Sequence, residues 1–298
     1  MTLSIGATIK LNDGHRIPQL GLGVWQTRPG AACEAAVLAA LEAGYRHIDT
    51  ASMYGNEESV GAAIRTSRIP REEIFVTTKL WNSDHGDPAQ ALDTSLRRLK
   101  FDYVDLYLIH YPVRERLRSW RVLEALRAAG KARSIGVSNF TIKHLNGLLA
   151  DSETVPAVNQ VEFHPYLNQR ELLNFCAAKG IVLEAYSPLT KGVRLKDPKL
   201  VAIAQKYPRS GAQQPAAARL RLPLVRRFSA RPETKSPAQI LIRWALQRGL
   251  VVIPKSANRQ RIFENADVFD FEITPEDMHI LDGFNENLRT CWDPTDAP

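Results

Sequence analysis

Cysteine is scarce in this sequence, and its spacing excludes two kinds of stabilising site. The 298 residues contain three cysteines, Cys33, Cys176 and Cys291. They are odd in number and far apart, and none belongs to a CxxC motif or a Cys/His cluster. We therefore expect neither a disulfide framework nor a metal site. Isolated cysteines in apolar helical patterns are usually small core residues.

Long apolar runs are also missing. No segment approaches the ~18 apolar residues of a membrane span. The N-terminal stretch MTLSIGATIK has no basic start followed by an apolar segment, so it does not resemble a signal peptide. The sequence therefore predicts a cytoplasmic protein that does not associate with membranes, and nothing in it calls for more than a monomer.

A widespread basic surface is absent too, although the net charge is +7. The segment Pro208–Glu233 has six arginines against one acid, so it accounts for most of that excess. Elsewhere no basic helix or aromatic–basic strand pattern remains, which argues against a nucleic-acid partner. The same segment has four prolines and a run of alanines. This composition predicts a disordered insertion at 208–233 rather than part of a packed core.

What the sequence does contain is a regular alternation of short apolar runs and amphipathic segments. A hairpin signal at Asn12-Asp13-Gly14, within Thr8–Leu20, comes first. The predicted strands are Gln19–Gly23, His47–Asp49, Phe75–Lys79, Val104–Ile109, Ser134–Val137, Val158–Glu162, Val182–Tyr186 and Leu250–Ile253. The predicted helices include Ala31–Ala43, Glu57–Arg65, Pro88–Leu99, Trp120–Ala129, Ile142–Leu149, Gln169–Lys179 and Pro237–Arg248.

Strands that alternate with helices indicate an α/β fold, either a (β/α)8 TIM barrel or a doubly wound sheet. The GxGxxG turn of dinucleotide-binding sheets does not follow the first strand, because Gly21-Leu22-Gly23 continues into Val24-Trp25. We therefore predict one barrel domain over residues 1–298.

Four titratable side chains lie where three consecutive predicted strands end. They are Asp49, Lys79, His110 and, just beyond the second strand, Tyr54. Taken one at a time, each could have a purely structural role: the aspartate as a helix or loop cap, the histidine or tyrosine as a core residue, and the lysine as a solvated side chain. Together, at the carboxyl ends of barrel strands, they predict a catalytic site. Tyr54 is a proton donor whose pKa a nearby ammonium would lower, Asp49 would hold Lys79, and His110 would orient a substrate oxygen. Such a set suits reduction of a carbonyl by a hydride-carrying cofactor.

Cofactor signals follow in the second half of the chain. Ser138 and Asn139 come after the fifth strand, Gln160 lies in the sixth, and Tyr186 ends the seventh before the bend at Ser187-Pro188-Leu189. After the eighth strand, Lys255, Ser256, Arg259 and Arg261 lie in a loop and helix start. Free backbone N–H groups at a helix start favour binding of a phosphate. The alternative is that these residues form a basic turn that only faces solvent.

These motifs make the chain resemble the aldo-keto reductase family over almost its whole length. The matching segments are GLGVWQ at Gly21, GYRHIDTASMYGNE at Gly44, TTKLWN at Thr77, DLYLIHYP at Asp105, IGVSNF at Ile135, NQVEFHPY at Asn159, EAYSPL at Glu184 and IPKS with RI.EN from Ile253. The resemblance implies a (β/α)8 barrel, an NADPH cofactor, and a tetrad of Asp49, Tyr54, Lys79 and His110 with Tyr54 as general acid.

The same resemblance implies further site residues. The nicotinamide amide would contact Ser138, Asn139 and Gln160, and Tyr186 would stack on the ring. Ser187 and Leu189 would line the pyrophosphate path. Lys255, Ser256 and Arg261 would hold the 2′-phosphate, with Glu264 and Asn265 near the adenine. Trp25, Trp81, Tyr111 and Trp292 would form an aromatic substrate pocket. In detail the chain looks like the bacterial branch that includes 2,5-diketo-gluconate reductases, which reduce keto-sugars, dicarbonyls and small aldehydes.

The chain departs from the family pattern at Tyr111, where many relatives have tryptophan, and at the 208–233 insertion. Two other functions remain open. A non-catalytic NADPH-binding regulator would need no tuned acid, and a barrel glycosidase would need a second carboxylate beside Asp49, for which Glu162 is available. The loops Arg114–Ser119, Thr190–Asp197 and Asn285–Pro298 would determine the carbonyl substrate, and their shortness predicts an open pocket.

Overall fold

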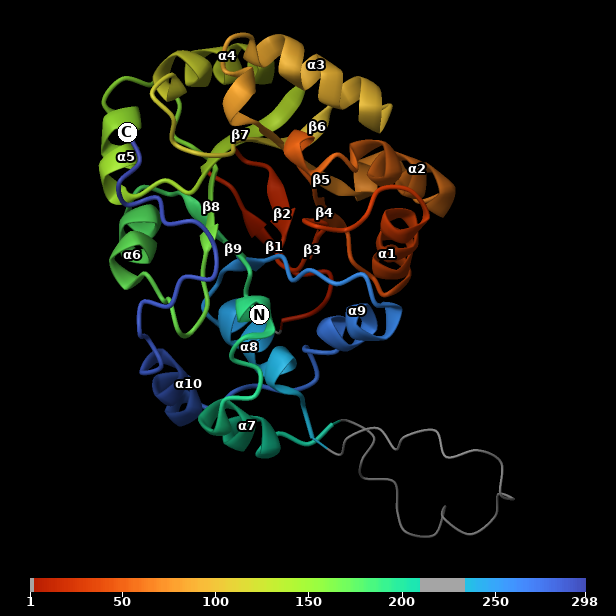
Figure 1. Cartoon of the computed structure of the whole chain (residues 1–298), viewed down its shortest axis with the longest axis vertical. Helices are drawn as coiled ribbons and strands as arrows, with labels where there is room; N and C mark the ends of the chain where they lie inside the picture. Colours follow the sequence, from red (N-terminus) through yellow and green to blue (C-terminus); the bar gives the residue numbers. More distant parts are fainter. Residues whose placement is uncertain (1–2, 210–233) are drawn as a thin grey trace.

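The computed structural model describes residues 3–209 and 234–298, and these residues form a ring of parallel strands surrounded by helices (Figure 1). The strands are β1 (Thr8–Lys10), β2 (Arg16–Pro18), β3 (Leu22–Gly23), β4 (His47–Asp49), β5 (Phe75–Leu80), β6 (Val104–Ile109), β7 (Ala132–Ser138), β8 (Val158–Glu162), β9 (Val182–Tyr186) and β10 (Val251–Val252).

The ring is a closed (β/α)8 barrel. Strands β3 to β10 pair in parallel in their chain order. The ring closes between its first and last strands, where Gly21 N donates to Val252 O at 2.9 Å and Val252 N donates to Gln19 O at 2.9 Å. The predicted fold class is therefore confirmed, and so is the N-terminal hairpin, formed by β1 and β2.

The helices cover the outside of the barrel (Figure 1). They are α1 (Ala31–Glu42), α2 (Glu57–Ser67), α3 (Pro88–Leu99), α4 (Arg116–Ala128), α5 (Ile142–Leu149), α6 (Arg170–Ala178), α7 (Pro198–Gln205), α8 (Pro237–Gln247), α9 (Arg259–Ala266) and α10 (Pro275–Asp282). Local sequence explains several starts. Asp87 and Ser236 accept hydrogen bonds from the backbone N–H groups of Gln90 and Gln239, ahead of prolines in the first turn.

One predicted loop is in fact partly helical. The segment Arg114–Ser119 was expected to be a substrate loop, but α4 begins at Arg116, four residues before the predicted start at Trp120. The Arg116 guanidinium donates to Val113 O and to Pro298 O, which ties this first turn to the chain terminus. Neither α9 nor α10 was predicted as a complete helix.

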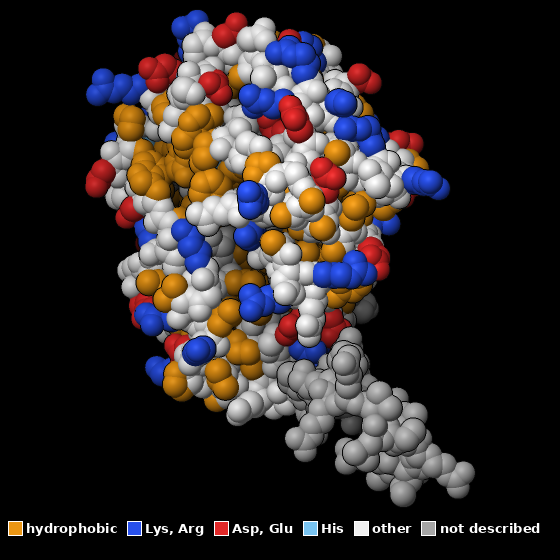
Figure 2. Space-filling view, turned by 45° about the vertical axis from the view of Figure 1, so that its right-hand side comes forward, with side chains coloured by type: hydrophobic (Ala, Val, Ile, Leu, Met, Phe, Trp, Pro, Cys, Tyr) orange, Lys and Arg blue, Asp and Glu red, His pale blue; other side chains and the backbone are white. Residues whose placement is uncertain are grey.

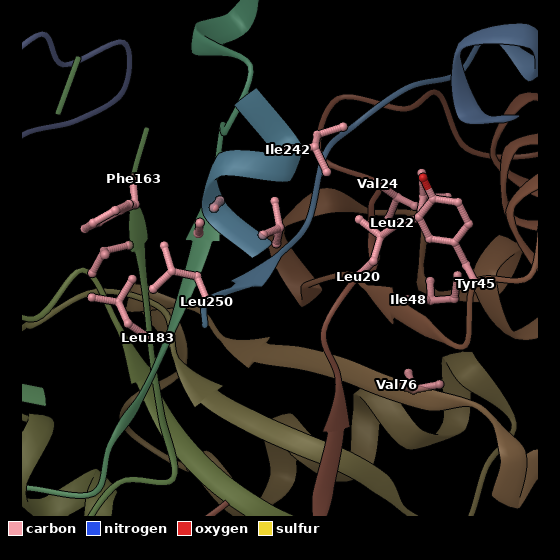
Figure 3. Packing of buried hydrophobic residues seen from close by; sticks show 14 of the residues in the cluster. Leu20, Leu22, Val24, Tyr45, Ile48, Val76, Phe163, Leu183, Ile242 and Leu250 are labelled. Carbon is pink, nitrogen blue, oxygen red and sulfur yellow. The ribbon is translucent and has the colours of Figure 1, made fainter. Parts of the chain in front are cut away.

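Two apolar clusters form the core. The larger one fills the layer between the strands and the helices, and Figure 3 shows Leu22, Tyr45, Ile48 and Val76 packed within it. The smaller one lies where Leu11 and Ile17 of the hairpin region meet Phe75, Leu106, Leu108, Val158 and Val251 from the strands. The hairpin region therefore shares one apolar cluster with residues of β5, β6, β8 and β10.

Charges are interspersed on the face shown in Figure 2, where Lys and Arg side chains alternate with Asp and Glu. In the described part of the chain, no helix is long and apolar enough to cross a membrane. Residues 210–233 of the predicted insertion lie outside the described residues. The prediction of a disordered loop does not hold at Pro208, which pairs with Thr234, or at Arg209, whose side chain makes three hydrogen bonds.

Candidate active site

Four polar side chains meet at the carboxyl ends of β4, β5 and β6. Asp49 ends β4, Lys79 is the penultimate residue of β5, and His110 directly follows β6. Tyr54 ends a short 3₁₀ turn, Ser52–Tyr54, after which Gly55 adopts a left-handed conformation with φ of 67°. The structure thus brings together the four residues that the strand ends predicted.

Lys79 forms a buried ion pair with Asp49. Its Nζ donates to the two carboxylate oxygens of Asp49 at 2.7 and 2.8 Å and to Thr50 O at 2.8 Å. The same ammonium lies 3.3 Å from Tyr54 Oη. Gln160 Nε2 also donates to Asp49 Oδ2 at 2.8 Å, a contact that the sequence did not indicate. The ammonium is therefore held against the phenol by a carboxylate that is itself held in place.

The pKa of Tyr54 does not move in the predicted direction. We expected the ammonium of Lys79 to lower it, but burial raises it well above 10, and the negative charge of Asp49 adds to the increase. The physical reason is that Asp49 neutralises Lys79, so no net positive charge offsets the cost of a buried phenolate. The phenol is consequently protonated throughout the neutral pH range.

His110 is a neutral imidazole. Burial lowers its pKa well below 6.5, and the charge of Lys79 lowers it further. Its ring stacks on Tyr111 at 4.9 Å between centroids and meets the edges of Tyr54 and Trp81 at 5.7 and 5.1 Å. A neutral imidazole in an aromatic surround can donate or accept one hydrogen bond without carrying charge.

A cavity of about 290 Å³ opens above these residues. Five aromatic side chains (Trp25, Tyr54, His110, Tyr111 and Trp292) line it together with polar ones, among them Asp49. Three of the predicted pocket residues are thus in its wall. Trp81 is not in the wall but lies behind it, edge-on to the Tyr111 ring at 5.7 Å.

Five wall residues were not among the predicted site residues: Gly23, Met53, Lys191, Ile253 and Cys291. Met53 directly precedes Tyr54, and Cys291 directly precedes Trp292, so their neighbours were a usable signal. Lys191 lies in the loop Thr190–Asp197, which was expected to determine the substrate, and it lines the cavity from the bend after β9. There Thr190 and Lys191 have φ values of 53° and 49°.

A second, longer groove of about 860 Å³ runs beside the cavity. Its wall includes Ser187 and Leu189 from the bend after β9 and, from the segment after β10, Lys255, Ser256, Arg261, Glu264 and Asn265. All seven were predicted to contact a cofactor. Trp25, Ser187, Lys191 and Lys255 line both the groove and the cavity, so the two spaces are adjoining.

The polar residues expected at the nicotinamide end are joined to one another. Ser138 Oγ donates to Gln160 O at 2.8 Å, Asn139 Nδ2 donates to His110 O at 2.9 Å, and Tyr186 Oη donates to Asn139 Oδ1 at 2.8 Å. Asn139 has a φ of 64°, a left-handed conformation that asparagine tolerates. All four also line the cavity. They form a hydrogen-bonded polar part of the cavity wall.

Part of the groove wall is formed by the loop before α9 and the start of that helix. Asn258 caps this helix by accepting from Arg261 N at 3.0 Å, and Ser256 Oγ accepts from Asn258 N at 3.1 Å. Lys255, Ser256 and Arg261 therefore converge where a helix N-terminus favours an anion. Arg259, which the sequence placed in the same basic group, instead pairs with Glu42 and does not line the groove.

Glu264 also has a partner that was not foreseen. Arg209 Nη2 donates to Glu264 Oε1 at 2.9 Å and to Gln239 Oε1 at 3.0 Å. The sequence treated Arg209 as part of an insertion without functional positions. It instead contacts a residue of the groove wall.

The fold and this site together define a barrel protein with a catalytic-type cavity and an adjoining cofactor-sized groove at the carboxyl ends of its strands. Comparison with known proteins makes the class specific. The model of the Aldo/keto reductase family matches residues 19–286. The chain is 45 % identical to the glyoxal reductase of Bacillus subtilis over 297 residues, which cover 99 % of this chain and 98 % of that protein. It is 44 % identical over 292 residues to a 9,11-endoperoxide prostaglandin H2 reductase of Trypanosoma cruzi, covering 96 % and 94 % of the two chains.

Solved structures agree. An aldo-keto reductase of Bombyx mori in complex with NADP superposes with a TM-score of 0.84 at 37 % identity, covering 99 % of both chains. An aldo-keto reductase from a deep-sea metagenome superposes with a TM-score of 0.85 at 40 % identity, covering 97 % of this chain and 99 % of the other. This chain belongs to the aldo/keto reductase family and is an NADP-dependent oxidoreductase.

Proposed function

We propose that this protein reduces small aldehydes and dicarbonyl compounds to alcohols with NADPH, and that Tyr54 is the general acid. The observation that carries the proposal is the 3.3 Å approach of Lys79 Nζ to Tyr54 Oη, with the ammonium buried and fixed on Asp49. The Asp49–Lys79 pair carries no net charge and burial disfavours a free phenolate, but the ammonium lies within hydrogen-bond distance of Tyr54 Oη and can hydrogen-bond this oxygen as its proton leaves.

Each residue of the cluster then has a distinct task. NADPH, when bound, supplies the hydride that adds to the carbonyl carbon. Tyr54 Oη transfers its proton to the carbonyl oxygen, so the C=O double bond becomes an alcohol. Lys79 stabilises the phenolate that remains, and Asp49 keeps Lys79 in place. His110, neutral because of burial, hydrogen-bonds the carbonyl oxygen and sets its direction without competing for the proton.

Residues of the cavity and of the groove together fit the cofactor. Ser138, Asn139 and Gln160 would hold the amide of the nicotinamide, and the ring of Tyr186 would stack on it. Ser187 and Leu189 would lie along the pyrophosphate, and Lys255, Ser256 and Arg261 would hold the 2′-phosphate at the start of α9. Glu264 and Asn265 would lie near the adenine, with Arg209 orienting the Glu264 carboxylate.

Cavity size and lining support small carbonyl substrates. A volume of about 290 Å³ is at the lower end of ligand pockets, and several aromatic side chains line the cavity. The Bacillus subtilis relative is named a glyoxal reductase. We therefore expect glyoxal, methylglyoxal and short aldehydes to be better substrates than bulky ketones.

The test is NADPH oxidation with this panel of carbonyls, comparing wild type with Tyr54→Phe and Tyr111→Phe. Loss of a general acid should lower kcat by about 10²- to 10⁴-fold in Tyr54→Phe. Tyr111→Phe removes a hydroxyl from the same cavity and should change kcat by less than about ten-fold. Equal rates in Tyr54→Phe and wild type would refute the acid assignment. Tight NADPH binding without turnover of any carbonyl would instead favour a regulatory protein.

A further inference from the structure

Glu162 makes an unusual set of contacts at the end of β8. Its carboxylate is buried, and it accepts four hydrogen bonds. Oε1 accepts from Thr290 N at 2.8 Å, from the Thr290 hydroxyl at 2.5 Å and from His164 Nε2 at 3.2 Å, while Oε2 accepts from Cys291 N at 3.1 Å. Three of these four donors come from a segment about 130 positions further along the chain, the C-terminal tail, which we define as residues 284–298.

The carboxylate is ionised in this environment. Burial acts to raise the pKa of Glu162, but the hydrogen bonds from His164 and Thr290 outweigh burial and the pKa is lowered. Glu162 does not line the cavity, and because it is ionised it has no proton to donate as a general acid. The glycosidase alternative, in which Glu162 would be the second catalytic acid, therefore loses its candidate.

The tail is also held from its other side. Lys191 Nζ donates to Thr290 O at 2.7 Å, and Ser187 Oγ lies 3.4 Å from Cys291 Sγ. Further along, Ala297 O accepts from His144 of α5 at 3.1 Å, and the chain end lies beside α5 in Figure 1. The backbone of Thr290 thus lies between a buried carboxylate from the barrel and an ammonium from the bend after β9.

The residues that follow this anchor form part of the cavity wall. Cys291 and Trp292 both line the cavity, and the Trp292 ring meets the edge of the Tyr111 ring at 4.8 Å. Trp292 is 47 % exposed, so contacts of its own ring do not hold it firmly. Its position depends on where the backbone of Thr290 and Cys291 is fixed.

We propose that Glu162 is a positioning residue that determines substrate size selectivity, by fixing Thr290 and Cys291 so that Cys291 and Trp292 complete the wall of the cavity. The inference rests on the proposed function, because it concerns the wall of the same cavity. Glu162 does not touch the reacting atoms. When its contacts with the tail are weakened, Cys291 and Trp292 become more mobile. Small carbonyls then bind less tightly, because the wall contacts them less closely, whereas bulky carbonyls are accommodated more easily.

Two variants test this. Glu162→Gln replaces one acceptor oxygen with an NH₂ donor, which meets an N–H group of Thr290 or Cys291 whichever way the amide turns. Thr290→Val removes only the hydroxyl donor, from a half-buried position in the tail. It provides the test if Glu162→Gln does not fold. Thr290→Ser keeps the hydroxyl and is the matched control.

Two measurements are needed. The first is kcat and KM for glyoxal and for phenylglyoxal, with Kd for NADPH determined separately by fluorescence. We expect KM for glyoxal to rise about five-fold or more in both test variants, because a wall displaced by the loss of these hydrogen bonds contacts the small substrate less closely. The phenylglyoxal to glyoxal ratio of kcat/KM should rise by a similar factor, with kcat for phenylglyoxal and Kd for NADPH changing less than about three-fold. Thr290→Ser should match wild type.

The second measurement is acrylamide quenching of Trp292, isolated as the difference between each protein and its Trp292→Phe counterpart. Quenching should increase in Glu162→Gln and Thr290→Val but not in Thr290→Ser. Folded variants with unchanged quenching and an unchanged substrate ratio would overturn the proposal. If wild type reduces no carbonyl, the proposed function fails, yet quenching alone still decides whether Glu162 positions the tail.

Discussion

Asp49 and Lys79 form an ion pair that water barely reaches, and removing one partner should cost far more stability than removing both. Lys79 is 0 % and Asp49 2 % exposed. In Asp49→Asn the ammonium stays buried with Thr50 O and Tyr54 Oη but without its charged partner. The new amide also presents an NH₂ group to the N–H groups of Lys79 or Gln160. A buried charge left without its partner costs about 3–5 kcal/mol.

The converse variant, Lys79→Met, leaves the carboxylate of Asp49 buried with Gln160 as its hydrogen-bond donor. It should cost a similar amount, about 3–5 kcal/mol. In the double variant no unpaired charge remains, and methionine fills much of the lysine volume. We therefore expect the double variant to lie within about 3 kcal/mol of wild type, so that the coupling free energy is about 3 kcal/mol or more.

Urea unfolding at pH 7, followed by circular dichroism, measures all four free energies of unfolding of this cycle. The pair Lys131–Asp93 is the control, because its side chains lie 2.6 Å apart but are 40 % and 36 % exposed. Asp93→Asn and Lys131→Met should each change the free energy of unfolding by less than about 1 kcal/mol. Additive losses in the Asp49/Lys79 cycle would refute the view that the buried charges depend on each other.

Other perturbations test other parts of the molecule. Arg261→Ala should reduce the preference for NADPH over NADH by about ten- to hundred-fold, since a charge-assisted hydrogen bond contributes about 1.5–3 kcal/mol. Arg259→Ala, on the same helix, should leave the preference intact, and equal effects of the two in steady-state kinetics would contradict the phosphate site. Burial raises the pKa of Glu184 from 4.5 to about 8, and the charge of Asp49 contributes. The folded state then binds one more proton than the unfolded state between these values, so stability falls as pH rises from 4.5 to 8. Glu184→Gln should match wild type near pH 4.5 and exceed it by a few kcal/mol at pH 8 in urea titrations, and a difference that does not vary with pH would disprove the shift. A Cβ on Gly61 would lie 2.1 Å from Leu99 O, whereas one on Gly147 meets nothing within 4 Å. Gly61→Ala should therefore destabilise the protein by about 1–3 kcal/mol, and Gly147→Ala should stabilise it by about 0.5–1 kcal/mol. If thermal unfolding ranks the two variants the other way, the packing of α2 against α3 can shift to accommodate the added methyl group.

Local patterns were sufficient for most of the barrel. The bounds of β4, β6, β8 and β9 match the prediction, because buried parallel strands are short apolar runs that end at polar residues. Two helix starts with both a cap and a proline, Asp87-Pro88 and Ser236-Pro237, were also located to the residue, whereas those at Asp197-Pro198 and Thr274-Pro275 were not. The start of α4 was misplaced because Arg116–Ser119 has no capping side chain.

The sequence by itself determined the fold, the strand ends at which Asp49, Lys79 and His110 stand, and the position of Tyr54 after them. These follow from periodicity, turn residues and motif order, all of which act over a few neighbouring positions. Tertiary structure decided the rest. Gln160 reaches Asp49 across 111 positions, Glu162 holds the tail across 128, and Arg209 contacts Glu264 across 55. The pKa of Tyr54 rises rather than falls because burial and the neutralising carboxylate act together. Such contacts and desolvation costs arise only when the ring of strands closes, so no local pattern could encode them.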